Sequence, residues 1–309
     1  MLNVTLKEHL IHVGDRFVLS LQRTLRIPND GRTYPLPPGL GVFPVFKASD
    51  FPDHLPSSWL RENSFFIPMY QREALWLGFT ATAWKPNAVM VAVGSVNAIS
   101  AETEFEYLHG DPQNYVVCPQ QSWLDGINSG QGTIRQFVAM PLGLGYTVES
   151  IITGEEKYGA IQIKVFEPKP GLFPDEPPVI NGNDPVRSAG LASAATMGLG
   201  AGGQMKQKIY PDPYSLDTWD IDNFGEMTIH IINSKNFQAI SGERCPPTPV
   251  DTAAYTKSGL PWFDLYDESE GDVVSPEDFA NFASIEDADI SEGSDIDQSR
   301  IHKLDKNDE

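Results

Sequence analysis

The segment MYQREALWLGFTATAWKPNAVMVAVG, residues 69–94, decides the fold class of this chain. It places Trp76 and Trp84, together with Arg72 and Lys85, around apolar runs that are typical of β-strands. Tryptophan buries a large apolar area and carries one polar edge, so two of them among charges mark either a packed sheet edge or a ligand-facing surface. The segment predicts β structure and leaves both roles for its tryptophans open.

Short strand-like segments continue on both sides of this run. Alternation of apolar and polar residues around Gly14 and Asp15 predicts a hairpin between segments 2–11 and 17–25. Short helices are expected to begin at Ser49 and Ser57, which are residue types that cap helices. Further strands are expected at 42–46, 64–68, 88–94, 96–100, 115–118, 134–139, 146–153, 160–166 and 227–232. This density of short strands predicts a mainly β or α+β fold, with an antiparallel β-sandwich-like body and short helices.

Composition divides the chain near residue 268. Residues 1–268 carry most of the aromatic and apolar side chains and are expected to form a single β-rich globular domain. The proline-rich segment 167–185 is a candidate boundary within it. Residues 269–309 are rich in Asp and Glu and poor in aromatic residues, which predicts an acidic disordered tail.

The overall charge and the cysteine count limit the partners. The chain has a formal net charge of −20, which repels phosphate backbones, so no nucleic-acid partner is expected. Cys118 and Cys245 are too few for a disulfide framework, and the N-terminus lacks a signal-peptide pattern, so we expect a cytoplasmic protein. No run reaches the roughly 20 strongly apolar residues that a membrane-spanning helix needs.

The sequence motifs indicate no reaction type. The sequence contains no Walker loop, nucleophile elbow, paired-cysteine motif or HExxH, so neither a cofactor nor a metal site is predicted and catalysis is left open. The candidate ligand-binding residues are aromatic or charged side chains within strand-like or turn-rich segments. They are Arg72, Trp76, Trp84, Lys85, Trp123, Arg135, Asp217, Trp219 and Asp220.

Two of these positions have alternative interpretations. Arg135 lies in TIRQFVAMP, which otherwise reads as a buried strand, so it needs either an internal ion pair or an anionic ligand. The acids between Asp212 and Asp222 either form turns and helix caps or provide carboxylate oxygens for a cation, although they lack EF-hand spacing.

The small-residue segment 188–205 also allows several structures. Small side chains recur every four residues, at Gly190, Ala194, Gly198 and Gly202, as in closely packed helices. A loop or packed short helix, a surface for self-association or membrane contact, and a phosphate-binding loop are the alternatives.

Several blocks of the chain resemble a family of uncharacterised proteins from bacteria and fungi. These blocks are MYQREALWL (69–77), WKPNAV (84–89), TIRQFVAMPLG (133–143), GYTVE (145–149), TGEE (153–156), YPDP (210–213), DTWD (217–220) and GLPWFDLYDE (259–268). The resemblance implies no known activity. Some members are labelled integral membrane proteins, which disagrees with the hydropathy of this chain.

These observations favour a soluble, non-catalytic binding or assembly module that uses a Trp-rich surface. Its partner would be an unknown protein or small molecule, and a homo-oligomer is an open alternative. One rival hypothesis is an enzyme acting on a polar small molecule or carbohydrate near Arg135 and Asp217–Asp220. The other is self-association or conditional membrane contact through 188–205.

Overall fold

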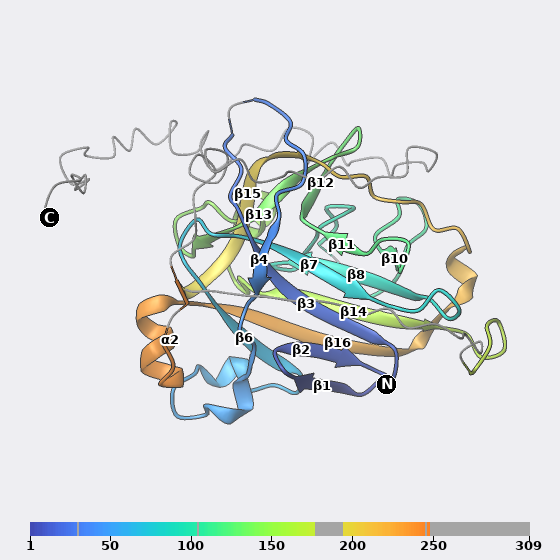
Figure 1. The fold of residues 1–309 in the computed structure, drawn as a ribbon, viewed down its shortest axis with the longest axis horizontal. Helices are drawn as coiled ribbons and strands as arrows, with labels where there is room; N and C mark the ends of the chain where they lie inside the picture. Colours follow the sequence, from blue (N-terminus) through green and yellow to red (C-terminus); the bar gives the residue numbers. More distant parts are fainter. Residues whose placement is uncertain (30, 104, 177–193, 245, 248–309) are drawn as a thin grey trace, which may run out of the picture.

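The described residues form one continuous β-sheet that folds over itself. The structure is a computed structural model, and it describes residues 1–29, 31–103, 105–176, 194–244 and 246–247. Within these residues, hydrogen bonding joins sixteen strands into one sheet (Figure 1). Ten of them follow the path β1-β2-β3-β7-β13-β15-β16-β14-β8-β10, and the other six pair with strands of this path or with one another. The pairing is antiparallel except that β6 runs parallel to β16. The predicted β-sandwich-like body is therefore confirmed.

The strands are mostly short and separated by turns. In chain order they are β1 (Val4–Lys7), β2 (Leu10–Val13), β3 (Phe17–Thr24), β4 (Gly39–Val42), β5 (Phe46–Lys47), β6 (Ser64–Met69), β7 (Ala74–Thr80), β8 (Asn87–Val93), β9 (Val96–Asn97), β10 (Val116–Cys118), β11 (Trp123–Leu124), β12 (Gly126–Gly130), β13 (Thr133–Pro141), β14 (Ile161–Pro168), β15 (Ala194–Lys206) and β16 (Trp219–Asn233). The helical elements are η1 (Ala48–Asp50), η2 (Ser57–Trp59), α1 (Val148–Thr153), η3 (Leu216–Thr218) and α2 (Ser234–Ser241).

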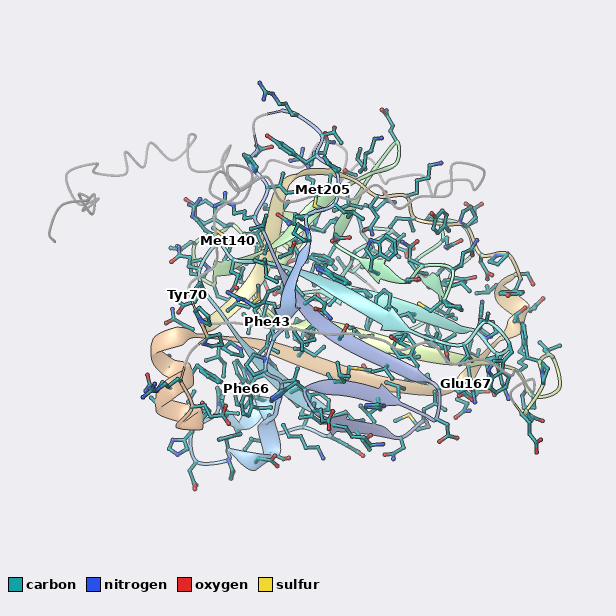
Figure 2. The ribbon with its side chains drawn as sticks, in the orientation of Figure 1. Phe43, Phe66, Tyr70, Met140, Glu167 and Met205 are labelled. Atoms are coloured by element: carbon teal, nitrogen blue, oxygen red, sulfur yellow. The ribbon has the colours of Figure 1, made fainter. Side chains whose placement is uncertain are left out.

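The main core lies between the two ends of the folded sheet. Alternate residues of β3 and β7, such as Leu19 and Leu77, pack in one apolar cluster with alternate residues of β8, β14 and β16, such as Val91 and Ile163. The fully buried Phe43, near the centre of Figure 2, belongs to the same cluster. The period of two in a strand thus gives each of these strands one face in the core.

Smaller apolar clusters cover parts of the outer faces. Ala88 and Met90 of β8 pack with Tyr115 and Trp219, which explains why every residue of β8 is buried. At the other end, Phe66 of β6, labelled in Figure 2, packs with Phe237 of α2. Between these clusters the outer face of β14, β16 and β6 is polar, and it forms the groove described below.

One expected strand is a helix. Segment 146–153 was predicted as a strand, whereas the structure contains helix α1 there. The Thr147 side chain accepts a hydrogen bond from the Ser150 N–H, and Gly154 ends the helix with a φ of 76°. The β-branched residues of this segment suggested a strand, but the threonine and glycine at its two ends are helix-terminating signals.

Replacing Thr147 with valine is expected to lower the free energy of unfolding by about 1 kcal/mol, because it removes the N-cap acceptor of α1 while keeping the side-chain volume. The hydroxyl also donates to Glu156 Oε1 at 2.6 Å, so that bond is lost as well. Urea unfolding measures the change. Thr80→Val, at an exposed strand position, is the matched control and should stay within about 0.5 kcal/mol. Equal midpoints for the two variants would contradict the capping role.

The small-residue segment is largely a strand. Residues 188–205 were expected to form a loop or short helix, whereas Ala194–Lys206 is β15 and pairs with β13 and β16. The small residues allow close approach on both sides of this strand. A Cβ on Gly202 would lie 2.7 Å from Val138 Cγ2, and one on Gly203 would lie 2.5 Å from the Pro28 carbonyl oxygen. Residues 188–193 lie outside the described part of the chain.

Other expected elements differ in detail. The hairpin around Gly14 is present, but its first arm is divided into β1 and β2 by a turn at Glu8 and His9, both with positive φ. The two expected helices are single 3-10 turns, η1 and η2, and neither has a side-chain cap.

The two expected domain boundaries, at 167–185 and near residue 268, lie partly or wholly outside the described residues. Segment 167–185 is described as far as residue 176, and β15 and β16, which follow it, join the same sheet as the strands before it. The expected acidic tail, 269–309, lies outside the described residues.

Candidate functional site

A groove lies on the outer face of β14, β16 and β6. It has a volume of about 650 Å³, which is within the range of small-molecule sites. Its lining is mixed, with polar strand residues as the floor and aromatic and charged side chains around them. The lining residues are Ser58, Trp59, Arg61, Ser64, Ser95, Phe105, Glu106, Lys157, Tyr158, Ala160, Gln162, Lys164, Glu226, Thr228 and His230. We call this site the polar groove.

The floor of the polar groove follows from strand register. Gln162 of β14 is opposite Thr228 of β16, and Thr228 is opposite Ser64 of β6. The next row on the same face pairs Lys164 with Glu226. Since successive side chains of a strand alternate between faces, the residues between them point to the apolar core instead. The register therefore gathers polar side chains from three strands on one outer face.

Two floor residues are polar and buried, and neither side chain makes a hydrogen bond within the described part of the chain. Ser64 is only 2% exposed, and its Oγ has no hydrogen-bond partner in the described part of the chain. Lys164 is 8% exposed. Its Nζ lies 5.4 Å from the ring centroid of Phe105, 5.3 Å from that of Phe224 and 4.0 Å from Glu226 Oε1. Because burying polar groups without partners costs free energy, such a floor is typical of a binding site.

His230 forms one wall of the polar groove. Its imidazole stacks on the Trp59 indole, with ring centroids 4.0 Å apart and planes 8° apart. Burial, and to a lesser extent the positive charge of Arg61, together lower the pKa of His230 to about 4. The ring is therefore neutral near pH 7 and offers one donor and one acceptor nitrogen.

The charges of the groove are separated by depth. The buried floor contains the Lys164 ammonium, whereas both carboxylates of the lining, on Glu106 and Glu226, belong to exposed residues. Arg61 and Lys157 add two exposed cations. The floor thus presents a positive charge and a free hydroxyl, a combination that suits a ligand rich in acceptor oxygens.

The structure brings together two of the sequence-predicted site residues. Trp76 of β7 and Trp123 of β11 line a second, smaller pocket of about 220 Å³ with Asp125. Trp123 is opposite Gly78 in the β7–β11 pair, which places its ring beside the outward face of β7. The indole Nε1 of Trp123 is buried, and no partner for it exists among the described residues.

The other candidates from the 69–94 segment make separate contacts. The Arg72 backbone N–H donates to the Ala139 carbonyl at 2.7 Å in a turn where Arg72 has a φ of 65°. The Arg16 guanidinium lies 5.7 Å from the ring centroid of Trp84. Lys85 Nζ forms an ion pair with Asp175 Oδ1 at 2.7 Å.

Hydrogen bonds within the protein hold the acidic segment 212–222 in place. Trp219 is fully buried, and its Nε1 donates to Asp212 Oδ2 at 2.9 Å. Asp212 Oδ2 also accepts from the Tyr115 hydroxyl at 2.5 Å. Asp217 is exposed in η3, and Asp220 accepts a hydrogen bond from the Asp222 N–H. Asp212 thus anchors this segment to Tyr115.

Arg135 lies apart from that segment. It is on β13, opposite Ile127 of β12 and Gln204 of β15. β15 pairs with β16 only at the far end of β16, near Ile231, and β14 pairs with the part of β16 that follows Trp219. The topology therefore separates Arg135 from Asp217–Asp220 rather than joining them in one cleft.

Sequence reasoning missed the polar groove and Asp125. The strand sequences IQIKVFEP and EMTIHIIN do alternate, so Lys164 and His230 were identifiable as residues on outward faces. The missing information was strand adjacency, since β6 and β14 join β16 from distant parts of the chain.

The described residues contain neither a metal-ligand cluster nor a membrane-spanning helix. No group of three or more His, Cys, Asp or Glu side chains there is arranged to hold a metal ion. No helix in that part of the chain is both long and apolar enough to span a bilayer.

Comparison with known proteins gives no match to a family model, a curated protein or a solved structure. The resemblance to uncharacterised bacterial and fungal proteins therefore stays a prediction. A functional assignment depends on the geometry of the two sites.

Proposed function

We propose that this protein is a binding module that holds a small anionic molecule, carrying a carboxylate or phosphate, in the polar groove. The observation that carries this proposal is the buried floor, where the Lys164 ammonium and the unpartnered Ser64 hydroxyl lie on adjacent rows of one sheet face. Both groups can donate hydrogen bonds, and an anion would supply an acceptor to Ser64 Oγ and a closer one to Lys164 Nζ than Glu226 Oε1, which lies 4.0 Å away.

The dimensions and walls of the groove support a small molecule of this kind. A volume of about 650 Å³ accommodates a ligand of metabolite size. Trp59 and His230 offer a stacked aromatic wall, and Phe105 offers another ring beside Lys164. Beside these rings a charge-assisted hydrogen bond to Lys164 is less screened than it would be in bulk water.

Like the hypothesis from the sequence, this proposal makes the protein a binding module. It places the binding site in the polar groove instead of on a Trp-rich surface. A continuous Trp-rich surface is less well supported, because Trp59, Trp84 and Trp219 lie in separate environments. The separation of Arg135 from Asp217–Asp220 favours binding in the groove over the enzyme hypothesis for those residues. The proposed setting is the cytoplasm, supported by the free thiol of buried Cys118.

Lys164→Met is expected to weaken anion binding at least about tenfold, because it removes a charged donor while keeping the apolar stem of the side chain. Citrate, inorganic phosphate and glucose 6-phosphate are screened by thermal shift, and the best binder is measured by isothermal titration. Glucose is the uncharged comparison for glucose 6-phosphate. We expect at least one anion to bind and glucose to bind more weakly than its phosphate.

Lys7→Met is the matched control, because Lys7 is an exposed lysine at the end of β1. It should bind the anion as the unmodified protein does. Binding that is equal in Lys164→Met and Lys7→Met would contradict the proposal, and so would the absence of binding by every anion of the panel.

A further inference from the structure

A second pocket lies between β7, β11 and the segment that precedes β4. Trp76 is on the outward face of β7, and Trp123 is on the neighbouring strand β11. Gly39 lies against the Trp76 ring, since a Cβ there would be 3.4 Å from Cζ2. The remaining lining is apolar except for one side chain, and it consists of Leu36, Pro37, Pro38 and Asp125. We call this site the tryptophan pocket.

Asp125 is the one charged residue in the lining of the tryptophan pocket. It is 2% exposed, and its Oδ2 accepts one hydrogen bond, from Gln207 Nε2 at 2.9 Å. The Gln207 side chain is in turn fixed by the Asp125 backbone N–H, which donates to Gln207 Oε1 at 2.9 Å. No cationic side chain of the described residues forms an ion pair with Asp125. Buried carboxylates in proteins are usually paired with a cation, and here none of the described residues supplies one.

We propose that the tryptophan pocket binds an organic ammonium group, with Asp125 as the counter-charge and Trp76 and Trp123 as the aromatic walls. Tryptophan is the side chain whose π face attracts a cation most strongly, and two of them line this pocket. The proline and leucine residues suit the methyl or methylene groups around such a nitrogen. This site is distinct from the polar groove and does not depend on it.

The composition of the pocket argues against other ligands. A metal ion needs several oxygen, nitrogen or sulfur ligands, whereas the lining provides a single carboxylate. A sugar needs several hydrogen-bonding partners for its hydroxyls, and the lining is otherwise apolar or aromatic. The volume of about 220 Å³ fits a headgroup or side-chain terminus better than a drug-sized molecule.

Choline is the probe, and 3,3-dimethyl-1-butanol is its uncharged isostere. An NMR titration that follows the indole N–H signals of Trp76 and Trp123 places the binding within the pocket. We expect choline to shift both signals and the alcohol to bind at least about tenfold more weakly, because it lacks the charge. Acetylated trimethyllysine amide tests whether an ammonium carried on a protein side chain is accepted as well. Binding of either ammonium with this charge preference supports the proposal.

Variants separate the charge from the apolar surface. Asp125→Asn keeps the shape of the side chain and should weaken choline binding at least about tenfold without affecting the alcohol. Trp76→Leu should weaken it as well, whereas Trp84→Leu, which changes a tryptophan outside the pocket, should not. Equal affinity for choline and the alcohol, unchanged choline binding by Asp125→Asn, or no shift by either ammonium at millimolar concentration would overturn the proposal.

Discussion

Replacing Asp125 with asparagine is expected to raise the free energy of unfolding at pH 8 by about 4 kcal/mol. Burial raises the pKa of Asp125 to about 7 from 3.8, and only the hydrogen bond from Gln207 acts in the opposite direction. At a pH between 3.8 and about 7, Asp125 carries a proton in the folded protein but has released it in the unfolded chain. Above pH 7 both states are ionised, and the folded state carries the full cost of a buried carboxylate. Asparagine cannot ionise, and its carbonyl can still accept from Gln207.

The gain should disappear as the pH falls from about 7 toward 4, because Asp125 then becomes protonated in the folded protein. Urea unfolding at pH 8, 6 and 4, in the absence of any ammonium compound, measures this dependence. Asp53→Asn, at an exposed residue, is the control and should change stability by less than about 0.5 kcal/mol at each pH. A loss of stability at pH 8 on Asp125→Asn would contradict the account, because it would mean that the ionised carboxyl is stabilising.

His230 is expected to make the protein less stable in acid, by about 3 kcal/mol between pH 6.5 and 4. Burial lowers its pKa from 6.5 to about 4, so in this interval the unfolded chain binds a proton that the folded protein excludes. The contribution of the neutral His230 ring to the free energy of unfolding is fully present above pH 6.5 and is lost as the pH falls toward 4. The sign is opposite to that of Asp125, so the two effects partly cancel over their common interval in the unmodified protein.

The His230 effect is therefore measured in the Asp125→Asn background, where the opposing dependence is absent. His230→Gln should flatten the loss of stability between pH 6.5 and 4, and the slope is compared rather than the absolute stability, because the stack on Trp59 is lost as well. His54→Gln, at an exposed histidine, should leave the slope unchanged. An identical acid slope with and without His230 would show that the buried ring does not control this dependence.

Local patterns predicted many of the strands, most clearly those with one apolar face, although the expected strand 42–46 is interrupted between β4 and β5 and the expected strand 96–100 is only the two residues of β9. Leu75 and Leu77 alternate with Trp76 in the decisive segment, and the structure has β7 there. The same reasoning was wrong for α1, because Thr147 and Gly154 determined that segment more strongly than its β-branched residues. It was also wrong for β15, where Gly203 suits the close approach of Pro28, a contact between distant parts of the chain.

The sites were less predictable than the strands. Trp76 and Trp123 were candidates from their residue type, and they share a pocket because β11 pairs with β7. Asp125 was missed, since an isolated aspartate has no sequence signature of burial. The floor of the polar groove was missed because Ser64 reaches Thr228 only through the parallel pairing of β6 with β16.

A crystal structure of the complex with the anion that gives the largest thermal shift tests the central claim most directly. The account predicts electron density for the anion in the polar groove, with acceptor oxygens within hydrogen-bond distance of Lys164 Nζ and Ser64 Oγ. Density for the anion at another surface, with the groove containing only water, would contradict it.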